Sequence, residues 1–147
     1  MNQEIRDQFN SMFGAWTTYT PTWTAATTNP SIGNGTLTGR YMKVGRTVTV
    51  SLLLIPGSTT TLGSGVYLFG LPFPAAADVV SCLGPARISG TATWLGHILV
   101  GASGSSANLT FSNTATDTRG ANMSESRPEV LAATNQVRAT ITYQTAS

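Results

Sequence analysis

The sequence predicts an all-β fold, an antiparallel, jelly-roll-like β-sandwich of about eight strands that follows a short N-terminal helical arm. Three observations lead to this prediction. After Trp16, no segment places its apolar residues at helical spacing. Short runs rich in β-branched and aromatic residues are separated by Gly, Pro and Asn turns. The last run, 137–144, alternates apolar and polar residues, as a strand with one buried face does.

The composition fits one globular domain with an unusually uncharged surface. The chain has 147 residues, of which 41% are hydrophobic and only 10% are charged. A domain of this size buries roughly two-thirds of the surface that its unfolded chain exposes. Thr, Ser, Gly, Ala and Asn take the place of surface charge, which suits strands and contacts between chains.

The first 14 residues form a separate unit, an arm before the β-domain of residues 15–147. Ile5, Phe9, Met12 and Phe13 lie at i, i+4, i+7 and i+8, which predicts one apolar stripe on a helix over 2–13. Gly14 is a natural helix stop. Because so short a helix is marginal alone, its stripe must dock on another surface. That surface is either its own domain, or a sister chain or larger assembly to which the arm attaches the protein.

The β-domain is divided by turn residues into strands of ordinary length. The tetrapeptide Lys43-Val44-Gly45-Arg46 predicts a tight hairpin, because Gly45 can take a positive φ. The weakly patterned stretch 113–135 carries a large share of the charge and predicts an exposed contact loop. The predicted strands are 17–24, 36–43, 47–55, 65–72, 86–94, 97–102, 108–112 and 137–144.

Three strands are apolar on both faces, at 52–55, 66–71 and 98–100. A two-layer sandwich covers one face of each strand, so the second face needs a loop, a helix or another subunit. Loops of the same chain are one explanation, but a subunit interface accounts for all three strands together. We therefore predict a homotrimer whose interface includes Leu53, Ile55, Phe69 and Leu99.

Catalytic and metal-binding sets are hard to assemble from this sequence. The chain has one histidine, His97, and one cysteine, Cys82, so the usual zinc ligand sets are missing within one chain. Glu125 with Glu129 or Asp117 is the one formal carboxylate pair, and nearby arginines favour solvated ion pairs instead. We expect no enzyme activity, no metal and no cofactor.

Other partner classes are also disfavoured. Arg40, Lys43 and Arg46 are too few to predict nucleic-acid binding. No apolar segment is long enough to predict a membrane span, and no signal peptide is expected. A glycan-binding surface stays open without a predicted location. The aromatic residues that could form it are Trp16, Tyr19, Trp23, Tyr41, Tyr67 and Trp94.

Residues 15–75 resemble a recurring β-domain of tailed-bacteriophage virion proteins, which include tail fibres, receptor-binding tips and head-decoration proteins. The resemblance is good up to about Pro74 and looser beyond it. It is carried by Trp16 with Tyr19-Thr20-Pro21, the turn Gly33-Asn34-Gly35, Gly39-Arg40-Tyr41, the Val44-Gly45 hairpin, Leu71-Pro72 and the closing Thr142–Gln144 strand. It implies a homotrimeric jelly roll and no shared catalytic residues.

The function expected from the resemblance and the arm is that of a non-enzymatic virion structural protein. In this prediction a trimeric knob, assembled in the host cytoplasm, decorates the capsid surface as a minor capsid protein. Its partners are copies of itself and other virion proteins such as the major capsid protein. The alternative is a tail fibre or tail-tip protein that recognises a host surface glycan. The arm favours decoration, because a chain without a shaft can only be fastened directly to a nearby surface.

Overall fold

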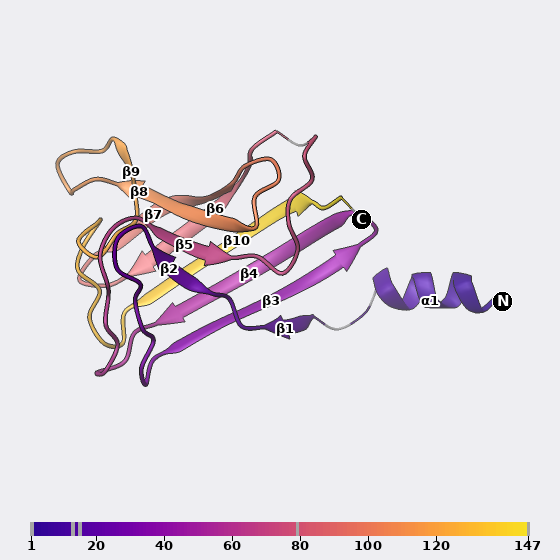
Figure 1. Cartoon of the computed structure of the whole chain (residues 1–147), viewed down its shortest axis with the longest axis horizontal. Coiled ribbons are helices and arrows are strands. Elements are labelled where there is room, and N and C mark those ends of the chain that lie inside the picture. The colour runs from indigo at the N-terminus through magenta and orange to yellow at the C-terminus, as the bar shows by residue number, and fades with distance from the viewer. Residues whose placement is uncertain (1, 13, 15, 79, 147) are drawn as a thin grey trace.

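The computed structural model describes residues 2–12, 14, 16–78 and 80–146. Within them lie one helix and ten strands, joined by antiparallel pairs (Figure 1). The elements are α1 (Gln3–Met12), β1 (Thr17–Tyr19), β2 (Trp23–Ala25), β3 (Thr36–Val44), β4 (Thr47–Ile55), β5 (Tyr67–Gly70), β6 (Cys82–Ser89), β7 (Thr93–Val100), β8 (Ser106–Ser112), β9 (Gly120–Asn122) and β10 (Gln136–Gln144).

The strands form one curled sheet in the order β1-β3-β4-β10-β6-β7-β8-β5-β2, with β9 paired to β8. β1 and β2 sit at opposite ends of this order although only residues 20–22 separate them in the chain. The curl brings these ends together, and the Tyr19 hydroxyl on β1 donates to the carbonyl of Gly70 on β5, the neighbour of β2, at 3.3 Å. The all-β prediction is therefore confirmed as a curled antiparallel sheet.

The core fills the inside of the curl. On β4 and β10 every second side chain is buried, as the alternation of 137–144 predicted. Val137, Ala139, Ile141 and Tyr143 are each at most 5% exposed. Buried tyrosines keep their hydroxyl groups hydrogen-bonded, since Tyr143 donates to the Phe73 carbonyl at 2.7 Å.

The predicted hairpin at 43–46 is confirmed. Val44 pairs with Thr47, so Gly45 and Arg46 form the connection between β3 and β4. Gly45 has a φ of 57°, a left-handed conformation that glycine adopts without steric cost.

Three of the predicted strands, 17–24, 86–94 and 97–102, have wrong bounds. The expected strand 17–24 is two strands, because Pro21 lacks the N–H that a continuous ladder needs and the chain crosses there from one sheet edge to the other. The turn expected between 94 and 97 lies instead at Gly90, whose N–H donates to the Ala92 carbonyl at 3.0 Å. Gly96 is part of β7, where a Cβ would come within 2.2 Å of the Thr110 carbonyl oxygen on β8.

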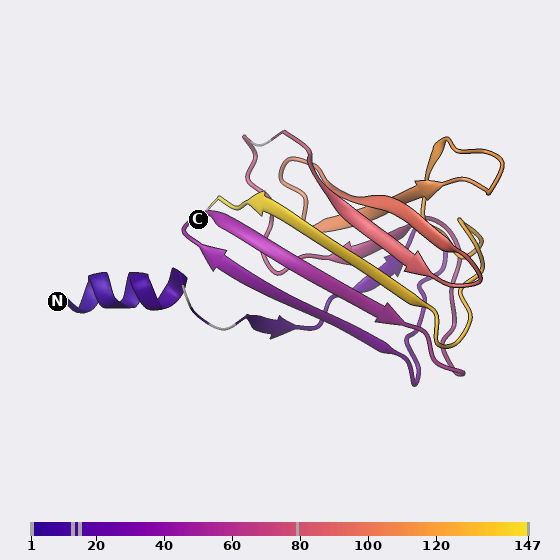
Figure 2. The same cartoon turned by 180° about the vertical axis from the view of Figure 1, so that it is seen from behind.

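Helix α1 projects from one end of the sheet. Figures 1 and 2 show it extending beyond the end of β3, and β10 finishes at the same end of the molecule. The helix begins because Asn2 caps it, its side-chain oxygen accepting the Glu4 N–H at 3.2 Å. Glu4 in the first turn also suits the positive end of the helix dipole.

Candidate functional site

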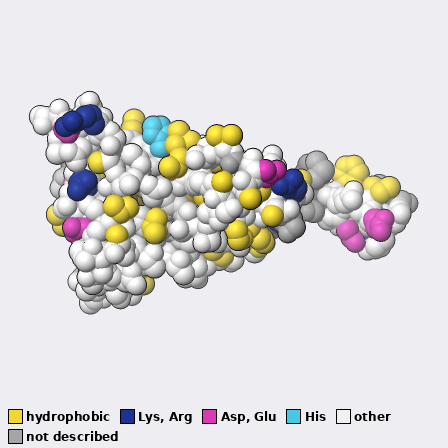
Figure 3. Space-filling model, turned by 45° about the horizontal axis from the view of Figure 1, so that its top comes forward, with side chains coloured by type: hydrophobic (Ala, Val, Ile, Leu, Met, Phe, Trp, Pro, Cys, Tyr) yellow, Lys and Arg dark blue, Asp and Glu magenta, His cyan; other side chains and the backbone are white. Residues whose placement is uncertain are grey.

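The first candidate contact surface is the apolar stripe of α1. Ile5 is 46% exposed and Phe9 is 51% exposed, and all side chains from Asn2 to Asn10 are exposed. The space-filling view shows the helix's apolar side chains turned away from its acidic ones (Figure 3). The stripe at Ile5 and Phe9 therefore does not pack on its own domain. Met12 lies within α1, and Phe13 lies outside the described residues.

The second candidate surface is the outward face of β6 and β7. Cross-strand pairing places Leu83 beside Leu99, Pro85 beside His97 and Arg87 beside Leu95. Leu83 is 60% exposed and Leu95 is 74% exposed. Figure 3 shows apolar side chains on both sides of the histidine. We call Leu83, Leu95 and Leu99 the β6–β7 leucine patch.

The four residues predicted for a subunit interface do not lie together. Leu53 and Ile55 are half-buried on the outer face of β4, whereas Leu99 is half-buried on β7. β10 and β6 separate those two strands. Leu83 and Leu95 expose more surface than any of the four. The outward direction of Leu95 was missed because a turn was expected there.

The prediction that Phe69 lies at a subunit interface is wrong. Its ring is 2% exposed and lies parallel to that of Trp23, with 6.3 Å between ring centroids. A side chain already buried by its own chain offers no surface to a neighbour, so Phe69 belongs to the core. The outward residue of β5 is Leu68, which is 38% exposed.

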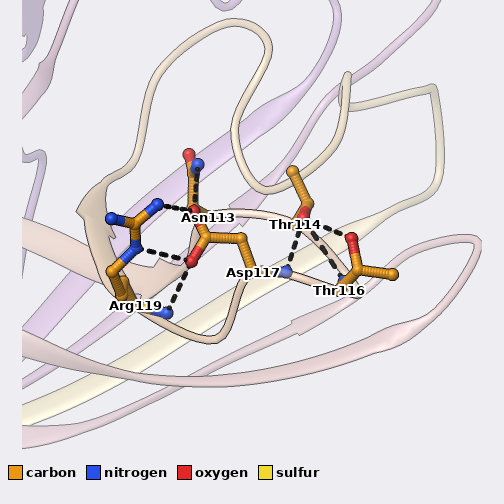
Figure 4. A network of polar contacts seen from close by, with 5 residues as sticks. All are labelled: Asn113, Thr114, Thr116, Asp117 and Arg119. Atoms are coloured by element: carbon orange, nitrogen blue, oxygen red, sulfur yellow. Dashed lines mark hydrogen bonds and ion pairs between the residues drawn. The ribbon is translucent and has the colours of Figure 1, made fainter.

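The carboxylates of the 113–135 loop are each held by different groups. Asp117 accepts from the Arg119 guanidinium at 2.8 Å and from the Asn113 amide at 3.0 Å (Figure 4). These side-chain hydrogen bonds lower the pKa of Asp117 well below its usual range. Glu125 accepts the Gly65 N–H at 2.8 Å. The bonds give these carboxylates a structural use, which is to hold the loop in place.

Glu129 ties this loop to the turn between β6 and β7. It accepts the Thr91 N–H at 2.9 Å, the Thr91 hydroxyl, and the Trp94 indole N–H at 3.0 Å. Burial raises the pKa of Glu129, but the hydrogen bonds outweigh it and lower the pKa below its usual value of 4.5. The ionised carboxylate therefore stabilises the folded state.

Glu129→Gln is expected to lower the free energy of unfolding by about 1–2 kcal/mol at pH 7, because the hydrogen bonds lose their charged acceptor. The pKa of Glu129 is lowered on folding, so its contribution is present above the usual value of 4.5 and is lost as the pH falls through the folded value. Urea denaturation of both proteins at pH 7 and at pH 3 should show a difference that shrinks at pH 3.

Asp78→Asn is the matched control for Glu129→Gln. Asp78 faces Arg46 at 3.5 Å and both side chains are at least half exposed, so little stability should be lost. Equal losses in the two variants would show that the loop is not held by Glu129.

Two structural observations and a set of searches bear on the kind of site. In the described residues, no three His, Cys, Asp or Glu side chains gather closely enough to hold a metal ion. No helix in that same part of the chain combines the length and the apolarity that crossing a membrane requires. Searches among protein families, curated proteins and solved structures found no match to this chain.

Proposed function

We propose that the protein is a non-enzymatic structural component of a tailed-bacteriophage virion, a homotrimeric jelly-roll knob on the particle surface. Its place is that of a capsid decoration or minor capsid protein, fastened by α1 to a neighbouring virion protein such as the major capsid protein. One observation carries this proposal, namely an amphipathic helix that extends from a packed β-domain with its apolar stripe exposed.

The exposed stripe supports an attachment role on energetic grounds. A helix of ten residues is about 15 Å long and marginally stable in isolation. Its apolar side chains gain stability only when another surface covers them, and the β-domain leaves Ile5 and Phe9 uncovered. A short helix with an uncovered apolar stripe suits direct attachment to a nearby surface, because binding there covers the stripe.

The β6–β7 leucine patch supports self-association. Clustered exposed apolar side chains mark an interaction site more often than single exposed residues do. Leu83 and Leu99 are cross-strand neighbours, and the Pro85–His97 pair separates them from Leu95. Leu53 and Ile55 expose less surface than Leu83 and Leu95, so the proposed trimer contact is centred on β6 and β7. Of the four residues predicted for the interface, Leu99 belongs to this contact.

Sedimentation of the full chain is expected to give a particle of three times 15.4 kDa. Leu83→Ser with Leu95→Ser should shift it to the monomer, because two apolar side chains leave the contact and each contributes about 1.5–3 kcal/mol when buried. Val130→Ser is the control, since Val130 is 64% exposed but lies in the 113–135 loop. A monomeric unmodified chain would exclude the homotrimer.

The tail fibre or tail-tip alternative is favoured by a different feature, an arginine-lined groove on the outer sheet face that suits a glycan. Immunogold labelling of particles separates the two positions. Label over the head supports decoration, and label confined to the tail tip supports receptor binding.

A further inference from the structure

A groove of about 540 Å³ runs over the outer face of β1, β3, β4 and β10. Cross-strand pairing explains its lining. Ser51 pairs with Arg40 on one side and with Thr140 on the other. Two residues further along β4, on the same face, Leu53 lies between Thr38 and Arg138. Two arginines from strands on opposite sides of β4 thus frame a floor of small polar side chains and one leucine.

The positive charge on this face has no counter-charge on the sheet. Arg138 pairs directly with Arg87 on β6, and like charges in that position destabilise a sheet. The strands β1, β3, β4, β6 and β10 contain no Asp or Glu. The acids of the β-domain lie elsewhere, at Asp78, Asp117, Glu125 and Glu129. An anion from outside the chain would neutralise the face.

The arginines beside the groove are held in place without being neutralised. The Arg40 guanidinium lies 5.3 Å from the centroid of the Trp16 ring. Arg138 donates twice to the Gln136 side-chain oxygen, at 3.2 and 2.8 Å. Neither partner carries a negative charge, and both arginines remain exposed. A guanidinium positioned in this way can still donate two parallel hydrogen bonds to a carboxylate.

The hydroxyl groups in the groove indicate the rest of the ligand. Within the described residues, the side chains of Thr18, Thr38, Ser51 and Thr140 make no hydrogen bond, whereas Thr49 and Thr142 on the same face bond each other at 2.9 Å. Hydroxyls both donate and accept, which matches the hydroxyl groups of a sugar. The size of the groove is within the usual range for ligand sites.

We propose that this groove binds an acidic polysaccharide, with Arg40 and Arg138 holding sugar carboxylates and the groove hydroxyls bonding the sugar rings. Two arginines at the groove and no lysine are too few for a nucleic-acid site, which requires contacts to many phosphates. The inference names the ligand class for the groove that favours the tail-tip alternative. Binding is tested on the purified chain, separately from the position on the particle that immunogold labelling tests.

The test is titration calorimetry of the full chain with polygalacturonate, hyaluronate and polysialate. At least one of them should bind, and Arg40→Gln or Arg138→Gln should each weaken binding about tenfold or more, as the loss of a charged hydrogen bond implies. Arg127→Gln removes the same charge from the 113–135 loop and should change affinity less than about twofold by the same reasoning. Arg40→Lys keeps the charge but loses the forked geometry. Its affinity should lie between that of the unmodified chain and that of Arg40→Gln. Thermal melts check that each variant is folded.

Several results would overturn the proposal. One is that none of the three polymers binds. Another is that a methyl-esterified polymer binds as well as its free acid, because the carboxylate would then have no part. Equal affinity for polyglutamate or double-stranded DNA would show that any polyanion is accepted. An equal loss in Arg127→Gln would place the binding outside the groove.

Discussion

Phe69→Ala is expected to lower the free energy of unfolding by about 3–5 kcal/mol, which is a large part of the stability of an ordinary domain. The ring is fully surrounded, it stacks on Trp23, and its removal leaves a cavity among other large side chains of the core. Urea denaturation followed by tryptophan fluorescence measures the loss. Phe69→Leu, which keeps most of the volume, should lose less and keeps the comparison usable if the alanine variant does not fold.

The matched control for Phe69→Ala is Leu68→Ala on the same strand. Leu68 points to the opposite face and is 38% exposed, so its removal should cost less than about 1 kcal/mol. The core assignment would be contradicted by a Phe69→Ala chain that keeps its folding stability but loses its oligomeric state. That result would return Phe69 to a subunit interface.

The second large effect concerns the arm. Ile5→Ser combined with Phe9→Ser is expected to abolish incorporation into particles while the β-domain keeps its stability and oligomeric state. Each apolar side chain buried at the attachment site contributes about 1.5–3 kcal/mol, so losing both weakens attachment about a hundredfold or more. The measurement is the amount of labelled full-length protein retained on particles that lack their own copy. Removal of residues 1–14 should have the same result.

Asp7→Ser controls for a general effect on the helix. Asp7 is two residues from Ile5 and Phe9, so it lies on the other side of the helix and should be dispensable for attachment. If the Ile5 and Phe9 variant is retained as well as the unmodified chain, the stripe is not the attachment element. The proposed attachment through α1 would then be wrong.

Local patterns were sufficient for several elements. The spacing of Ile5 and Phe9 predicted a helix with one apolar stripe, and Gly45 predicted the β3–β4 connection. The alternation in 137–144 predicted which side chains of β10 are buried. These features depend on residues within one turn or one strand, so neighbouring positions contain the needed information.

The contact surfaces were harder to predict. Leu53, Phe69 and Leu99 have the same character in the sequence, yet Phe69 lies in the core and the other two face outward. Leu95 was placed in a turn that lies several residues earlier. Which face of a strand is buried depends on its partners and register, and a strand that is apolar on both faces leaves that choice open.

The amino-acid sequence by itself determined that this chain is a β-domain with an amphipathic arm, because helical and strand periodicities are local properties. The tertiary structure alone decided that the arm's stripe is uncovered, that Pro21 divides two edge strands, and that Arg40 and Arg138 frame one groove. Those two arginines are distant in the chain. They line one groove only because β3, β4 and β10 pair in that order. Strand order follows from the packing of the whole chain, since non-local pairing is chosen by the burial that all strands achieve together.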